Sequence, residues 1–216
     1  VLVTVGGTEA ITATLLSILE PGDKVLLPTP IYSGYEPVIT LAKAELIQMD
    51  TSQTDFVLTP DLLEATLEEH GDQVKAVILN YPSNPIGVTY TREEVKSLAD
   101  VLKKYPVFVM CDEIYSELVY DETHTSIAEF IPNQTILING LSKSHAMTGW
   151  RIGFLFGPKE LIKEIVKVHQ YLVTAASTIS QKAAYAALTT SMNAGEEMKK
   201  EYQVRRNFVF KEESRL

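Results

Sequence analysis

The sequence has a single cysteine, Cys111, among 216 residues, so it cannot form an internal disulfide bond. A lone thiol is typical of a reducing compartment, and we expect the protein to be cytoplasmic. No hydrophobic run approaches the roughly 20 apolar residues that a membrane-spanning helix needs. The sequence also lacks the pattern of a secretory signal, in which basic residues precede a short apolar stretch. These absences argue against a disulfide-stabilised scaffold and against an integral membrane protein.

Positive charge is also scarce, with 19 Lys and Arg residues against 28 Asp and Glu residues, a formal net charge of −9. This balance argues against nucleic acid or an anionic membrane as the main partner. The four histidines are scattered along the chain, and no second His or Cys lies at metal-ligand spacing from His145. We therefore predict no metal site. A Ser-His-Asp hydrolase would need a G-x-S-x-G elbow, which the sequence lacks.

What remains is a chain with 45% hydrophobic residues, enough for one large globular domain. It starts at Val1 without a methionine, and its last residues, NFVFKEESRL, contain no helix stop signal. No repeat or linker divides it. We therefore expect one domain over residues 1–216 that is an internal piece of a longer protein.

Helical and strand patterns alternate along the chain. A capping box of Thr91 and Glu94 begins one helix, and Thr59-Pro60 and Gly71 bound another. Continuous apolar strands separated by helices predict an α/β fold with a mostly parallel sheet covered on both faces. The predicted helices cover residues 8–19, 59–71, 91–104 and 160–189, and the predicted strands cover 24–28, 74–81, 107–111, 135–139 and 152–156.

Ligands of such sheets bind at the carboxyl ends of the strands. The polar residues that follow the predicted strands are Asn80, Asn84, Asp112, Glu113, Asn139 and the loop with Lys143. We expect the functional site to lie among them.

Two further segments carry chemistry but allow more than one interpretation. TVGGTEA (4–10) places two glycines and a threonine at a helix start, which predicts an anion site or, alternatively, a tight turn with a threonine cap. CDEIYSEL (111–118) places two carboxylates at a strand end, where they could bind metal, act as acid and base, or cap a solvated helix.

The segment NGLSKSHAMTGWRIG (139–153) makes these patterns specific. The spacing S-K-x-x-x-M-T-G-W-R-x-G, preceded in order by N-P-x-G and D-E-x-Y, resembles the fold type I pyridoxal-phosphate aminotransferases of class I/II. The resemblance covers essentially the whole chain and is to the large, cofactor-binding domain. It implies a three-layer α/β/α fold in which one strand, residues 152–156, is antiparallel to the rest.

The resemblance also implies a role for each matching residue. Lys143 matches the lysine that forms a Schiff base with pyridoxal phosphate and then shuttles a proton, which requires a depressed pKa. Asp112 matches the carboxylate that keeps the pyridine nitrogen protonated, so that the ring is an electron sink. Asn84 and Tyr115 match the pair that hydrogen-bond the 3′-oxygen, and Tyr32 matches the aromatic residue that stacks on the ring.

The phosphate contacts follow from the same comparison. Arg151 matches the phosphate-binding arginine, whose bidentate fork suits this group, and the backbone of Gly7 and Thr8 completes the cradle. The best-known branch of the family has a phosphate-binding serine where this sequence has Gly140. We expect Ser142 to take over part of that contact.

The family's N-terminal arm and its small C-terminal domain, with the arginine that binds the substrate carboxylate, have no counterpart in these 216 residues. The resemblance implies a homodimeric aminotransferase, with a broad, aromatic or aspartate-like amino donor and 2-oxoglutarate as acceptor, and inactivity of this segment alone. The segment around Lys143 looks most like bacterial enzymes that act on aromatic amino acids, aspartate or acyl-diaminopimelate. One alternative is a carbon–sulfur β-lyase, but that branch typically has histidine at the position of Tyr115. Another is the non-catalytic, aminotransferase-like sensor domain of a transcription regulator.

Overall fold

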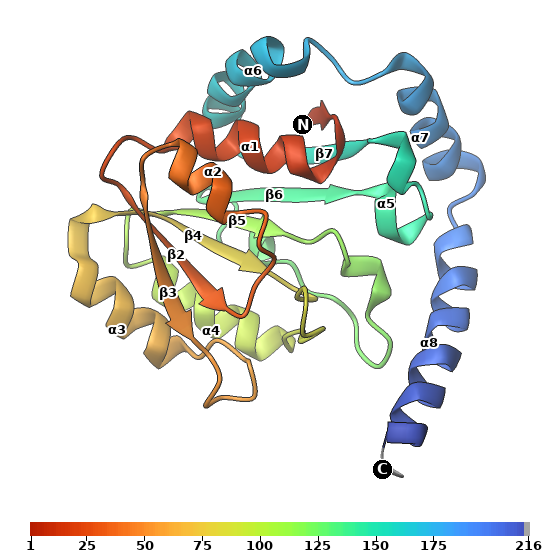
Figure 1. Cartoon of the computed structure of the whole chain (residues 1–216), viewed down its shortest axis with the longest axis horizontal. Helices are drawn as coiled ribbons and strands as arrows, with labels where there is room; N and C mark the ends of the chain where they lie inside the picture. Colours follow the sequence, from red (N-terminus) through yellow and green to blue (C-terminus); the bar gives the residue numbers. More distant parts are fainter. Residues whose placement is uncertain (214–216) are drawn as a thin grey trace.

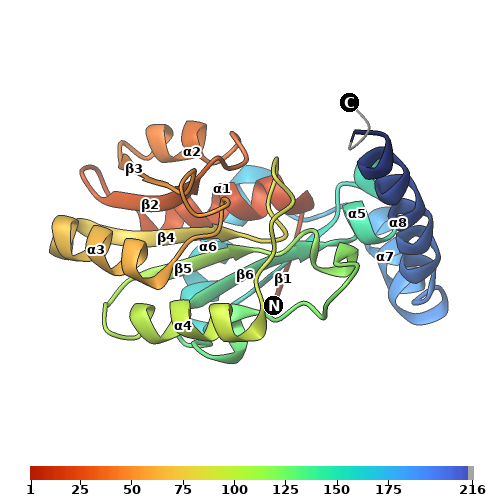
Figure 2. The ribbon, with the colours of Figure 1, turned by 90° about the horizontal axis from the view of Figure 1, so that it is seen from below.

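The computed structural model describes residues 1–213 and contains a seven-stranded mixed sheet between helices (Figures 1 and 2). The strand order is β1-β7-β6-β5-β4-β2-β3. Strand β7 is antiparallel to both neighbours, and the other pairings are parallel, which confirms the predicted sheet with one antiparallel strand. The strands are β1 (Leu2–Thr4), β2 (Lys24–Thr29), β3 (Glu45–Asp50), β4 (Val74–Asn80), β5 (Phe108–Asp112), β6 (Thr135–Gly140) and β7 (Gly153–Phe156).

The longer helices are α1 (Gly6–Ile18), α2 (Glu36–Leu41), α3 (Pro60–His70), α4 (Arg92–Leu102), α6 (Lys159–Val173), α7 (Thr178–Thr190) and α8 (Ala194–Glu213). Figure 2 shows α2 on one side of the sheet and α4 on the other. Two separate hydrophobic clusters fill the two interfaces. Ile11 and Ile165 belong to the cluster under α1 and α6, and Leu67 and Leu98 to the one under α3 and α4. The predicted three-layer α/β/α fold is therefore confirmed.

Helices α7 and α8 lie together at one end of the sheet, with the short α5 (Leu141–Ser144) beside them (Figure 1). The helical pattern predicted for 160–189 is in fact two helices. The break follows Val173, because Thr174 has a positive φ of 63° and residues 174–177 are not helical. Within the described residues, no helix is long and apolar enough to cross a membrane.

Candidate active site

All nine residues assigned to the site from the sequence line one pocket at the carboxyl ends of the parallel strands. They are Gly7, Thr8, Tyr32, Asn84, Asp112, Tyr115, Ser142, Lys143 and Arg151. The pocket brings together segments that are up to 144 residues apart, from Gly7 to Arg151. The same pocket is also lined by Asn80, one of the polar strand-end residues expected near the site. Four further lining residues, Ile11, Tyr35, Ile114 and Thr148, were not expected from the sequence.

Asp112 is the last residue of β5 and is only 6% exposed. Its Oδ2 accepts a hydrogen bond from Tyr35 Oη at 2.9 Å, and its Oδ1 accepts one from Ile114 N at 3.1 Å. Burial raises the pKa of Asp112 to about 6, because the charged form loses its hydration, while the two hydrogen bonds act in the opposite direction. Asp112 is thus a buried acceptor whose charged form is stabilised by the Tyr35 hydroxyl and the Ile114 N–H.

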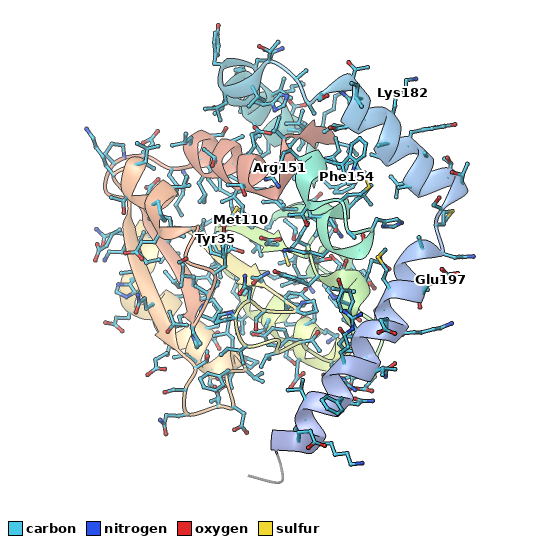
Figure 3. All side chains as sticks on the ribbon, turned by 45° about the vertical axis from the view of Figure 1, so that its right-hand side comes forward. Tyr35, Met110, Arg151, Phe154, Lys182 and Glu197 are labelled. Atoms are coloured by element: carbon cyan, nitrogen blue, oxygen red, sulfur yellow. The ribbon has the colours of Figure 1, made fainter. Side chains whose placement is uncertain are left out.

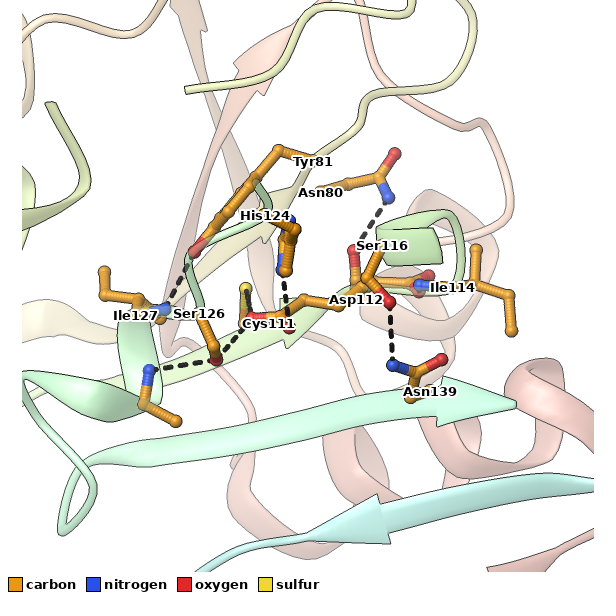
Figure 4. Close-up of polar contacts among 12 residues, drawn as sticks. Asn80, Tyr81, Cys111, Asp112, Ile114, Ser116, His124, Ser126, Ile127 and Asn139 are labelled. Atoms are coloured by element: carbon orange, nitrogen blue, oxygen red, sulfur yellow. Dashed lines mark hydrogen bonds and ion pairs between the residues drawn. The ribbon is translucent and has the colours of Figure 1, made fainter. Parts of the chain in front are cut away.

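Glu113 does not join Asp112 in the pocket, so the interpretation of the two carboxylates as an acid and base pair was wrong. Successive strand side chains point to opposite faces, and Glu113 is 2% exposed within a separate network. Figure 4 labels its partners Cys111, His124 and Ser126. Its carboxylate accepts hydrogen bonds from Ser126 Oγ at 2.6 Å and Cys111 Sγ at 3.4 Å, and pairs with His124 Nε2 at 2.8 Å. This network fastens residues 124–126 to the end of β5. The alternative of a solvated helix cap is wrong for the same reason.

Two asparagines connect the strand ends around the pocket. Asn80 Nδ2 donates to the backbone oxygen of Asp112 at 2.9 Å, and Asn80 Oδ1 accepts from the backbone N–H of Asn84 at the same distance. On the other side, Asn139 Nδ2 donates to Ser116 Oγ at 3.1 Å. These bonds fix the loop with Asn84 and the segment after Asp112 relative to the sheet.

Lys143 lies in α5, the single helical turn that directly follows β6. Its Nζ is 5.3 Å from the centre of the Tyr115 ring, so the ammonium faces an aromatic surface. Gly140 precedes this turn, and a Cβ there would lie 3.0 Å from the backbone oxygen of Ile152. In this chain, a serine at position 140 would therefore crowd β7, which gives a packing reason for the glycine. Ser142 does line the pocket.

The other end of the pocket has the features of an anion site. Arg151 has a left-handed backbone (φ 49°, ψ 59°), which costs a non-glycine residue on the order of 1 kcal/mol. Its guanidinium lies beside the first turn of α1 (Figure 3), and a Cβ on Gly6 would be 2.6 Å from Nη2. Gly6 also has a φ of 77°, and Gly7 and Thr8 follow it in the first helical turn. A fixed cation next to helix-start N–H groups suits a phosphate.

The threonine cap offered as the alternative for this segment is wrong. The helix begins at Gly6, two residues before the predicted start, and its N-cap is Val5, whose side chain makes no capping hydrogen bond. Thr8 lies inside the first turn, with its side chain exposed.

The Tyr35 phenol is the pocket residue that sequence reasoning missed and that matters most for charge. We expect Tyr35→Phe to raise the pKa of Asp112 by about one further unit, because the lost hydrogen bond stabilises the carboxylate. A pH titration of the labelled Asp112 carboxyl by carbon NMR would measure this. Tyr90→Phe is the matched control, since its buried hydroxyl accepts from Leu58 N and does not contact Asp112. An unchanged Asp112 titration in Tyr35→Phe would contradict the assignment.

Comparisons with known proteins agree with this geometry. The family model described as aminotransferase class I and II matches residues 1–213. A probable N-acetyl-LL-diaminopimelate aminotransferase of Bacillus subtilis (strain 168) is 52% identical over 97% of this chain and 53% of its own length. The structure of aspartate aminotransferase from Thermus thermophilus with maleate superposes with a TM-score of 0.91 at 34% identity, over 97% of this chain and 55% of that one.

An aromatic aminotransferase structure from Pyrococcus horikoshii OT3 also has a TM-score of 0.91, at 37% identity, over 97% of this chain and 57% of that one. The chain thus spans about half the length of the curated relatives it matches. The match to the family model extends over almost the entire sequence and includes every residue of the pocket. The chain belongs to the class I and II aminotransferase family.

Proposed function

We propose that this chain is the cofactor-binding domain of a pyridoxal-phosphate-dependent enzyme that transfers an amino group from an amino acid to a 2-oxo acid. One observation carries the proposal. A lysine amine, a buried carboxylate and an arginine beside a helix start line the same pocket. The residues fit the cofactor in its three chemical parts, since the amine suits the aldehyde, the carboxylate the ring nitrogen, and the arginine the phosphate.

When bound, the cofactor supplies an electron sink that stabilises negative charge at the substrate carbon. Asp112 would hold a proton on the ring nitrogen, because a buried carboxylate stabilises a cation beside it. Asn84 and Tyr115 would hydrogen-bond the ring oxygen, with Asn84 held in place by Asn80. Tyr32, at the pocket wall, would cover one face of the ring.

Lys143 would hold the cofactor covalently, and its amine would be the base that moves a proton at the substrate carbon. Its position against Tyr115, half-buried in the turn after β6, keeps the amine at the pocket rather than in bulk solvent. A positioned base of this kind contributes a factor of about 10² to 10⁴ to such a proton transfer.

We further propose that the N-terminal arm, the small domain and the arginine for the substrate carboxylate lie outside these 216 residues. The coverage of about half of each relative supports this division. The complete protein would then be a cytoplasmic homodimer, and this segment alone would be inactive. The substrate would be an amino acid of the kinds named for the relatives, which include aspartate, aromatic and N-acylated diaminopimelate aminotransferases.

The direct test is chemical labelling of the lysine. We expect the complete protein with pyridoxal phosphate to be yellow, through absorption in the violet, and borohydride to fix the pyridoxyl group on Lys143. Peptide mapping locates the label, and Lys159, exposed at the start of α6, is the internal control. A label on any other lysine would refute the assignment. An assay of aspartate, an aromatic amino acid and N-acetyl-LL-diaminopimelate with 2-oxoglutarate detects transamination through the glutamate formed. An S-substituted cysteine, assayed without an oxo acid, detects β-elimination, which would release a thiol, ammonia and pyruvate.

A further inference from the structure

The first turn of α1 is held from the side by a buried Glu9–His169 pair. Glu9 is 9% exposed and His169 is 4% exposed, although 160 residues separate them in the sequence. His169 comes from α6, which packs along α1 (Figure 1). Its Nδ1 is 3.2 Å from both carboxylate oxygens of Glu9. Because an ionised carboxylate can only accept, Nδ1 is the donor.

The same carboxylate also fixes the backbone at the entrance to the helix. Glu9 Oε2 accepts a hydrogen bond from the backbone N–H of Val5 at 3.1 Å. Val5 is the N-cap, and its own side chain makes no capping bond. Glu9 therefore reaches back to the backbone N–H of the N-cap residue, as the acidic residue of a capping box does, and it sets the direction in which the chain enters Gly6 and Gly7.

The Glu9 carboxylate lies close to the helix-start N–H groups that would bind a phosphate, and its negative charge opposes that binding. The first turn of α1 attracts an anion through its N–H groups, and Gly7 and Thr8 line the pocket together with Arg151. A negative charge one residue beyond Thr8 competes with a phosphate for the same positive potential. Little water reaches Glu9 to screen that charge, so the hydrogen bond from His169 must compensate for it.

We propose that Glu9 and His169 are positioning residues for the phosphate cradle. Glu9 orients the first turn of α1, and the hydrogen bond from His169 stabilises the carboxylate, so that it competes less with phosphate for the N–H groups of the turn. The inference deepens the proposed function and rests on it only for the identity of the phosphate compound. The cradle itself can be tested with inorganic phosphate, because the arginine and the helix-start N–H groups recognise the phosphate group alone.

The experiment measures the dissociation constants of inorganic phosphate, pyridoxal phosphate and pyridoxal for variants of the complete protein. We expect His169→Phe to weaken inorganic phosphate and pyridoxal phosphate about tenfold, the loss of one charge-assisted hydrogen bond. Pyridoxal, which lacks the phosphate, should change little. Adding Glu9→Gln to His169→Phe should restore most of the phosphate affinity, since the amide oxygen still accepts from Val5 and no buried charge remains.

The matched control is His124→Phe, which removes another largely buried Glu–His contact, to Glu113, on a different part of the sheet. It should lower the melting temperature and leave the affinity for inorganic phosphate unchanged. If His169→Phe behaves in the same way, the pair is only structural and the inference is overturned. A wild type that binds inorganic phosphate but not pyridoxal phosphate would refute the proposed function, while the inference would still be decided by the phosphate data. A wild type that binds neither overturns both.

Discussion

Lys143→Ala should abolish transamination by the complete protein, with kcat reduced by at least about 10⁴-fold, because both covalent capture and proton transfer are lost. Among the described residues that line the pocket, Lys143 has the sole side-chain amine. Arg151, the other cation there, stays protonated and cannot act as a base. The variant should still bind pyridoxal phosphate non-covalently, since the phosphate contacts come from α1 and Arg151.

The measurement combines single-turnover kinetics with cofactor titration. Lys163→Ala is a suitable control, because this lysine is exposed on α6 and its ion pair is with Glu160, which is also exposed. We expect it to retain wild-type rates. If Lys143→Ala kept a substantial part of the wild-type kcat, another group would have to be the base, and the proposed role of Lys143 would be wrong.

The sequence predicted the pocket better than it predicted the elements around it. All nine assigned residues line the pocket. Most belong to the motifs that carry the family resemblance: Asn84, Asp112, Tyr115, Ser142, Lys143 and Arg151. By contrast, β1, β3, α2 and α8 were not predicted. Strand β1 has only three residues, and β3 (ELIQMD) is an edge strand with mixed polar and apolar residues, so neither has a strong period. Helix α8 is largely polar and lacked a stop signal.

Contacts between segments that are distant in the sequence could not be predicted either. Tyr35 lies three residues after the assigned Tyr32, but its hydrogen bond to Asp112 depends on β2 and β5 converging at one edge. The Glu9–His169 pair is similar, because it exists only through the packing of α6 on α1. Asp112 lines the pocket and Glu113 does not, because successive side chains at the end of β5 point to opposite faces of the sheet. Which of the two lines the pocket depends on the exact residue at which β5 ends. Local pattern does not determine any of these three.

Asp112→Asn should have two large and opposite effects. Turnover of the complete protein should fall by about 10³-fold or more, because a neutral amide cannot stabilise a proton on the ring nitrogen through charge. Without cofactor, however, the folded state should become more stable at neutral pH. The carboxyl has a pKa of about 6 when folded and an ordinary value of 3.8, so folding favours its protonated form. Ionisation of Asp112 therefore lowers the stability of the folded protein.

The sign and the pH window of this effect follow from that raised pKa. The stability that protonated Asp112 contributes is fully present below about pH 4 and is lost as the pH rises through about 6. Above that pH the wild type should be about 3 kcal/mol less stable than Asp112→Asn, and the two should converge at the acidic end. Urea unfolding of cofactor-free protein at pH 4 and pH 8 measures the difference, with Asp100→Asn, an exposed site on α4, as control. Equal stabilities of wild type and Asp112→Asn at pH 8 would show that ionisation of Asp112 does not destabilise the folded state. Equal turnover of the two proteins would show that the charge of Asp112 is not used in catalysis.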